Sequence, residues 1–92
     1  MEIEFDPAKR AITLIHRGLD FARCTEVFAG PHLQLEDTRQ DYGERRFIVF
    51  GFLDGREVVI VWTPRGDARR IISMRKANER EIRRFKEFLD RS

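Results

Sequence analysis

The first part of the chain has the periodicity of helices. Asp6-Pro7 predicts a helix start, because an Asp side chain caps free backbone amides and Pro needs no amide partner in the first turn. Gly18 predicts its end. Asp20 opens a second, short helix that ends at Gly30-Pro31. In the first helix four apolar residues share one side at i, i+3, i+4 and i+7 spacing, and we expect them to be buried: Ala8, Ala11, Ile12 and Ile15.

From residue 33 onward the period changes to that of strands. Leucines alternate with polar residues over 33–36, which predicts a half-exposed strand. Apolar runs at 47–53 and 58–63 flank Asp54-Gly55. This dipeptide favours a tight hairpin turn in which both central residues have positive φ. The pattern therefore predicts an antiparallel hairpin at this point.

A second turn and a further strand follow the hairpin. The turn is indicated by the Pro, Gly and Asp residues of segment 64–67. Segment 69–75 then continues the antiparallel meander. Strict alternation along this strand predicts that Ile71, Ser73 and Arg75 share one face.

The last segment has the pattern of a capped helix. Asn78 followed by Glu81 resembles a capping box, in which each side chain bonds the other residue's backbone amide. Ile82, Phe85 and Leu89 keep helical spacing. With a short strand at the N-terminus, the elements predict a single α+β domain over residues 1–92: strand, two helices, four-stranded antiparallel meander, C-terminal helix.

Charge is distributed unevenly along the chain. Of the 92 residues, 41% are hydrophobic and 37% charged, and the formal net charge is only +2. Residues 1–44 nevertheless carry a net charge of −4 and residues 45–92 a net charge of +6. Fifteen of the 18 basic residues are Arg, whose planar fork suits phosphate, although a GC-rich genome explains the excess of Arg equally well. The second half is where an anionic partner such as RNA is expected to bind.

Several classes of protein are excluded by the sequence. A lone Cys24 leaves no internal disulfide and no Cys-based zinc site. The longest apolar run, 58–62, is too short to span a membrane, and the N-terminus lacks the pattern of a signal peptide. No nucleotide-binding loop or Ser-centred nucleophile motif occurs. We expect a cytoplasmic protein that uses no metal or other cofactor.

Four segments, in order, carry a resemblance that spans nearly the whole chain. They are Glu4-Phe5-Asp6-Pro7-Ala8-Lys9, Phe21 through Val27-Phe28, Asp41-Tyr42-Gly43-Glu44-Arg45-Arg46, and Arg70-Ile71-Ile72-Ser73-Met74-Arg75-Lys76-Ala77. Together they resemble the BrnT toxins of bacteria. The resemblance implies a fold similar to the RelE and ParE toxins and a metal-independent ribonuclease activity that arrests growth. It also implies neutralisation by a BrnA-type antitoxin, whose complex with the toxin represses their shared promoter DNA.

The chain departs from the family pattern at three places. Phe5 stands where the family usually has Trp, a change that we assign to packing. His16-Arg17-Gly18 replaces the usual Lys-His-Gly, which moves the imidazole by one residue, about 100° around a helix. Phe85 stands where a Tyr is frequent, which removes a hydroxyl group.

Metal-free RNA cleavage has three chemical requirements. The 2′-OH must lose its proton, the charge on the pentavalent phosphate must be stabilised, and the departing 5′ oxygen must gain a proton. The candidates for stabilising the phosphate are Arg75, which the resemblance favours and which ends a strand just before a helix N-terminus, and Arg46. Each could instead form an exposed ion pair, Arg75 with Glu44 or Glu79 and Arg46 with Glu44.

Two side chains are candidates for proton transfer. Glu44 could act as a general base, or it could only orient Arg46 or contact the antitoxin. His16 could carry a proton near neutral pH, or it could be a polar or capping residue at a helix end. His32, beside Pro31, is the weaker histidine candidate.

The remaining candidates are residues for RNA contact. Tyr42 could stack on an unpaired base, whereas Trp62 and the Phe residues are expected in the core. A noncatalytic module that binds nucleic acid or an antitoxin is the alternative to a ribonuclease. The side chains expected to contact RNA, or otherwise to be solvated, are Arg17, Arg39, Tyr42 and Lys76.

Overall fold

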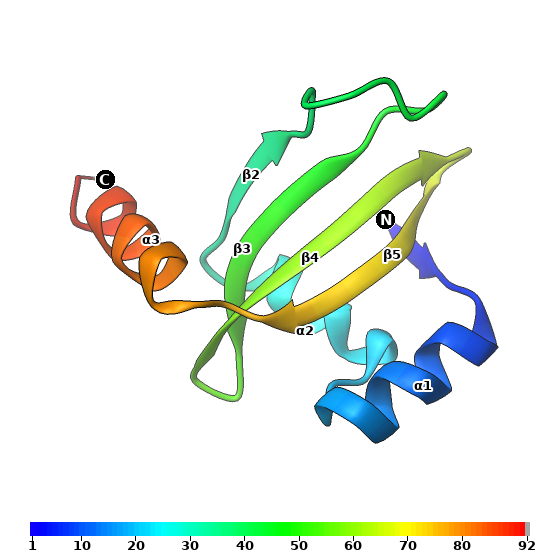
Figure 1. Cartoon of the computed structure of the whole chain (residues 1–92), viewed down its shortest axis with the longest axis horizontal. Coiled ribbons are helices and arrows are strands. Elements are labelled where there is room, and N and C mark those ends of the chain that lie inside the picture. Colours follow the sequence, from blue (N-terminus) through cyan, green and yellow to red (C-terminus); the bar gives the residue numbers. More distant parts are fainter. Residues whose placement is uncertain (92) are drawn as a thin grey trace.

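A five-stranded sheet forms the centre of the computed structural model, which describes residues 1–91 (Figure 1). Its strand order is β1-β5-β4-β3-β2. The predicted meander pairs antiparallel throughout, and β1 pairs parallel with β5, so the sheet is mixed. This confirms the predicted α+β class. The strands are β1 (Glu2–Glu4), β2 (Leu33–Glu36), β3 (Phe47–Leu53), β4 (Arg56–Arg65) and β5 (Ala68–Lys76).

Both predicted hairpin turns are present. Asp54 and Gly55 have φ of 53° and 75°, as a turn with two positive φ values requires. The second turn is tighter than segment 64–67, because Arg65 already pairs with Ala68. Only two residues connect β4 to β5, and Gly66 is at positive φ.

A β-bulge changes which side chains of β5 share a face. Val61 pairs with Ser73, whereas the next residue, Trp62, pairs with Ile71, so one residue of β5 is extra at this point. An extra residue reverses the alternation of side chains. Ile71 therefore faces the core and is 2% exposed, while Ser73 and Arg75 face the other side. The prediction that these three residues share a face was wrong.

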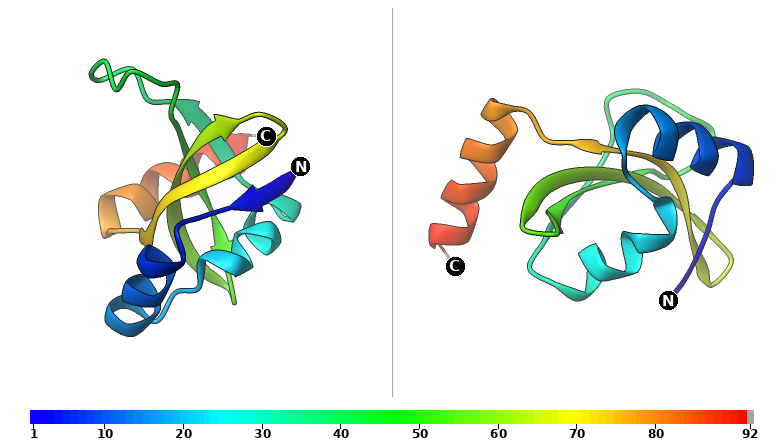
Figure 2. Two further views of the ribbon diagram at one scale, coloured as in Figure 1. Left: turned by 90° about the vertical axis from the view of Figure 1, so that its right-hand side faces the viewer. Right: turned by 90° about the horizontal axis from the view of Figure 1, so that it is seen from below.

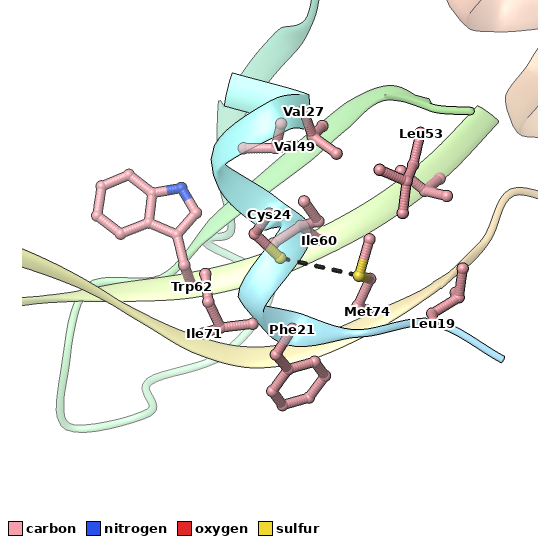
Figure 3. Close-up of a cluster of buried hydrophobic side chains, with 11 residues drawn as sticks. Leu19, Phe21, Cys24, Val27, Val49, Leu53, Ile60, Trp62, Ile71 and Met74 are labelled. Atoms are coloured by element: carbon pink, nitrogen blue, oxygen red, sulfur yellow. Dashed lines mark hydrogen bonds between the residues drawn. The ribbon is translucent and has the colours of Figure 1, made fainter. Parts of the chain in front are cut away.

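The core lies between the sheet and the predicted second helix. That helix begins with a 3-10 turn, Phe21–Arg23, capped by Asp20, and continues as α2 (Cys24–Ala29). Figure 3 shows side chains of α2 and of the strands meeting in this core. Trp62 is 5% exposed, which confirms its predicted place in the core; its fully buried neighbours include Cys24, Val27, Val49, Ile60 and Met74.

Gly51 allows α2 to approach β3 closely. A Cβ at this position would lie 2.5 Å from Val27 Cγ1 and 3.4 Å from His32 Cβ. We expect Gly51→Ala to destabilise the protein by about 1–3 kcal/mol in urea denaturation, because overpacking forces side chains and backbone to shift. In a Val27→Ala background the same substitution should cost less, since the clashing methyl is gone. Equal losses in both backgrounds would contradict this explanation.

Helix α1 (Pro7–Arg17) has the predicted ends but not the predicted burial. The Asp6 carboxylate accepts from Ala8 N at 2.9 Å, and Gly18 closes the helix at φ 68°. The apolar stripe is nevertheless exposed: Ile12 is 57% and Ile15 79% exposed, and Ala8 and Ala11 are also exposed. The expected buried stripe was therefore wrong. Its opposite side anchors the helix, because Arg10 pairs with Asp20 at 2.7 Å and Arg17 donates to Met74 O at 2.9 Å.

Helix α3 (Glu79–Arg91) lies at the end of the molecule away from α1 (Figure 2). The predicted capping box is formed, with both bonds between Asn78 and Glu81 at 2.9 Å. Phe85 is 2% exposed and its ring centroid lies 5.1 Å from that of Phe52. In β3, Gly51 and Leu53 face the core, so the side chain of Phe52 between them points to the other face of the sheet. Helix α3 therefore packs on the face opposite α2. Within residues 1–91 no helix is long and apolar enough to cross a membrane.

Candidate active site

Four of the eight predicted site residues line one open depression: His16, Arg17, Arg75 and Lys76. The last turn of α1 supplies His16 and Arg17, and the end of β5 supplies Arg75 and Lys76. The hydrogen bond from Arg17 to Met74 O joins these two elements. None of the four side chains is acidic. The depression therefore combines three cations with an imidazole.

Arg75 is held in place by the capping box. Its two terminal nitrogens donate to the two oxygens of Glu81, both at 2.8 Å. These bonds raise the pKa of Arg75, while burial and the nearby positive charge of Arg39 act against the rise. The same bonds lower the pKa of Glu81. The ion-pair partner is thus Glu81, and not Glu44 or Glu79 as the alternative interpretation had it.

The other four predicted residues form a second group in the loop between β2 and β3. Arg46 bonds Glu44 at 2.9 Å, and its guanidinium lies 4.1 Å from the centroid of the Tyr42 ring. One face of that ring is therefore occupied. Tyr42 donates to Asp37 at 2.9 Å, and Arg39 donates to Asp37 through two bonds of 2.8 Å. Asp37, which is 7% exposed, thus organises the group.

The two groups do not share one depression. Arg75 pairs with Val59 of β4, which pairs with Phe50 of β3, four residues after Arg46. Strand geometry then places the Cα atoms of Arg46 and Arg75 about 16 Å apart. Arg17 and Lys76, rather than Arg46 and Glu44, line the depression with Arg75. The effect of Arg39 on the pKa of Arg75 links the two groups electrostatically.

Three other side chains that sequence analysis discussed lie outside this depression: His32, Cys24 and Phe85. His32 Nδ1 lies 2.8 Å from Gly30 O and the ring meets Phe28 edge-on. Burial raises the pKa of Cys24 to about 12, so its thiol is a poor nucleophile. Phe85 anchors α3 and does not line the depression of His16. Among residues 1–91, no group of three His, Cys, Asp or Glu side chains is arranged to hold a metal ion.

Asp37 should control the order of the β2–β3 loop. Hydrogen bonds from Arg39 lower its pKa, although burial acts in the opposite direction. Because the pKa of Asp37 is lower in the folded loop, the ionised carboxylate stabilises the loop fully at pH values above its ordinary pKa of 3.8. This stabilisation is lost as the pH falls through the pKa of Asp37 in the folded protein. At neutral pH we expect Asp37→Asn to increase tryptic cleavage at Arg39 and Arg45 several-fold. Asp41→Asn removes a charge from the same loop but keeps the Oδ1 that accepts from Gly43 N, so it is the matched control; equal cleavage in both variants would contradict the assignment.

The fold and the depression together define a class, a small α+β protein whose exposed cations and imidazole suit a phosphodiester substrate. The chain belongs to the BrnT family: the family model described as "Ribonuclease toxin, BrnT, of type II toxin-antitoxin system" matches residues 5–81. It is therefore a ribonuclease toxin of a type II system, which implies an RNA substrate and a cognate antitoxin. The match includes all eight predicted site residues and ends early in α3. No curated protein matches the chain.

Proposed function

We propose that the scissile phosphate of RNA binds in the depression formed by His16, Arg17, Arg75 and Lys76, and that cleavage there needs no metal ion. The observation that carries this proposal is the composition of the depression, three cations and an imidazole without an acidic side chain among them. Cations bind and stabilise the phosphate charge, and the imidazole can transfer a proton. Arg and Lys alone are too basic to do the latter at neutral pH.

Each lining residue has a separate proposed role. Arg75 stabilises the charge that develops on the phosphate, because Glu81 fixes its guanidinium beside the N-terminus of α3. Arg17 and Lys76 hold the phosphate and its neighbour. The 2′ oxygen bonds to phosphorus and loses its proton to water, and His16 gives a proton to the 5′ oxygen as the P–O5′ bond breaks. The shift of the imidazole by one residue leaves His16 in the depression, which supports this role despite the departure from the family pattern.

The loop group extends the surface for RNA. Arg39 and Arg46 attract the phosphates of nucleotides beside the cleavage site, and a base stacks on the face of the partly exposed Tyr42 ring that Arg46 does not cover. Glu44 pairs with Arg46 outside the depression, which favours an orienting role over that of general base. The toxin acts in the cytoplasm, where its RNA substrate is. Its partner is a BrnA-type antitoxin, and their complex represses promoter DNA.

Purified toxin incubated with RNA, with and without EDTA, tests the proposal. We expect cleavage that survives chelation and leaves the matching DNA strand intact, because attack by the 2′-OH is required. Cleavage abolished by EDTA and restored by a divalent ion would overturn the metal-free mechanism. A gel shift of intact RNA by folded, antitoxin-free protein would favour a noncatalytic binding module.

A further inference from the structure

The exposed stripe of α1 is an unusual feature for a helix that lies against its own domain. Ile15 is 79% and Ile12 57% exposed, and Ala8 and Ala11 extend the stripe toward the start of the helix. The helix is fixed from its other side by Arg10 and Arg17. The stripe therefore faces outward in the folded protein. Contiguous exposed apolar surface of this kind commonly marks a protein–protein contact.

The stripe is continuous with the candidate active site. Ile12 and His16 are one turn apart on α1. They line a second depression together with Lys9, Arg17 and Ser73, and this depression shares His16 and Arg17 with the first. A segment that covers Ile12 and Ile15 would thus extend over His16, where we place the scissile phosphate.

The charges around the stripe indicate what kind of segment would bind. The two depressions are lined by Lys9, Arg17, Arg75 and Lys76 and by no Asp or Glu from residues 1–91. An occupant needs apolar side chains for Ile12 and Ile15 and acidic side chains for the cations. RNA provides negative charge but no aliphatic surface. A second copy of this chain, docked through the same face, would bring like charges together.

We infer that an amphipathic helix of the cognate antitoxin docks on the stripe of Ala8, Ala11, Ile12 and Ile15, with acidic residues over His16 and Arg17. Its apolar side buries the isoleucines and its acidic side occupies the position of the phosphates, in the manner of a helix bound to a surface groove. Docking requires only the exposed stripe and the cations. Inhibition by blockage of the active site rests additionally on the proposed function.

The test measures antitoxin affinity for toxin variants by titration calorimetry, with the purified cognate antitoxin as probe. Ile15→Glu should raise Kd by at least about tenfold, because it removes an aliphatic side chain that the bound helix would bury and adds a charge that repels the acidic helix. Ile15→Lys should raise Kd less than Ile15→Glu does. Leu35→Glu is the matched control: Leu35 is 51% exposed, but it lies on β2 and outside the stripe. Its Kd should stay within about twofold of the wild-type value.

The outcomes separate docking from catalysis. Unchanged affinity of Ile15→Glu, or a loss caused by Leu35→Glu instead, would overturn the inference. So would a toxin dimer that Ile15→Glu dissociates while antitoxin affinity is unchanged, because the stripe would then bind a second copy. RNA cleavage by Ile15→Glu should equal that of wild type and should resist added antitoxin. If neither protein cleaves RNA but Ile15→Glu loses antitoxin binding, the docking surface stands and the proposed active site fails.

Discussion

Replacing Arg75 by alanine should lower the rate of RNA cleavage by about 10²–10³-fold. Arg75 is the cation in the depression whose orientation is fixed by two hydrogen bonds, and it lies beside a helix N-terminus. A preorganised charge stabilises the transition state most, because no reorganisation is needed as the phosphate becomes pentavalent. The measurement is single-turnover cleavage of an RNA that the wild-type toxin cuts. The cleavage rate of Arg75→Lys should lie between those of wild type and Arg75→Ala, since lysine keeps the charge but lacks the planar fork.

Two further variants distinguish a role in catalysis from a role in folding. Arg65→Ala removes an exposed arginine beside the β4–β5 turn, and its cleavage rate should stay close to that of wild type. Glu81→Gln keeps a capping-box side chain but removes the negative charge beside Arg75. Because Glu81→Gln keeps the Arg75 guanidinium, it should lose less cleavage than Arg75→Ala. If Arg75→Ala acted only by breaking the ion pair that holds α3, the two variants would lose cleavage to a similar extent. A folded Arg75→Ala protein with near-normal cleavage would contradict the assigned role.

The features that sequence analysis predicted well depend on a few adjacent residues. Asp54 and Gly55 both adopt positive φ, a conformation that this residue pair favours by itself, without contacts from other strands. The capping box of Asn78 and Glu81 is similarly local, because its two bonds span only three residues. Helix ends and hairpins could therefore be predicted in the absence of tertiary information.

The errors arose where distant elements decide the outcome. The spacing of Ile12 and Ile15 correctly predicts that they share one side of α1, but spacing does not specify what that side meets. Arg10 and Arg17 orient the helix with the stripe outward. In β5, Ile71 and Ile72 are both apolar, so the sequence contains no signal for the bulge that reverses the alternation.

In the candidate site, too, contacts between residues close in sequence could be predicted, and contacts between distant elements could not. Glu44 lies two residues from Arg46, and their ion pair could be predicted from this short separation, although both residues lie in the loop before β3. Arg75 instead pairs with Glu81, because the capping box turns that carboxylate back toward the end of β5. Asp37 was missed as the centre of the loop group, since its partners come from a loop without periodicity. The meeting of His16 with Arg75 required the packing of α1 beside β5.

His16→Ala should lower the cleavage rate by about 10²-fold or more, the usual contribution of a positioned general acid. His16 lines the depression together with Arg17, Arg75 and Lys76, and it is the only one of these side chains suited to proton transfer near neutral pH. Thr13→Ala, one turn earlier on the same helix, is the matched control and should remain close to wild type. Comparable thermal unfolding of both variants would show that α1 is intact.

The proton that His16 is proposed to donate can be tested with a modified substrate. In an RNA whose scissile 5′ oxygen is replaced by sulfur, the departing group is a thiolate, which is far less basic than an alkoxide and needs no proton in order to leave. His16→Ala should then cleave this RNA at nearly the wild-type rate, while it remains slow on ordinary RNA. If the variant were slow on both substrates, His16 would act before the leaving group departs, by binding the phosphate or by accepting the 2′-OH proton. The acid would then have to be sought among other groups near Arg75.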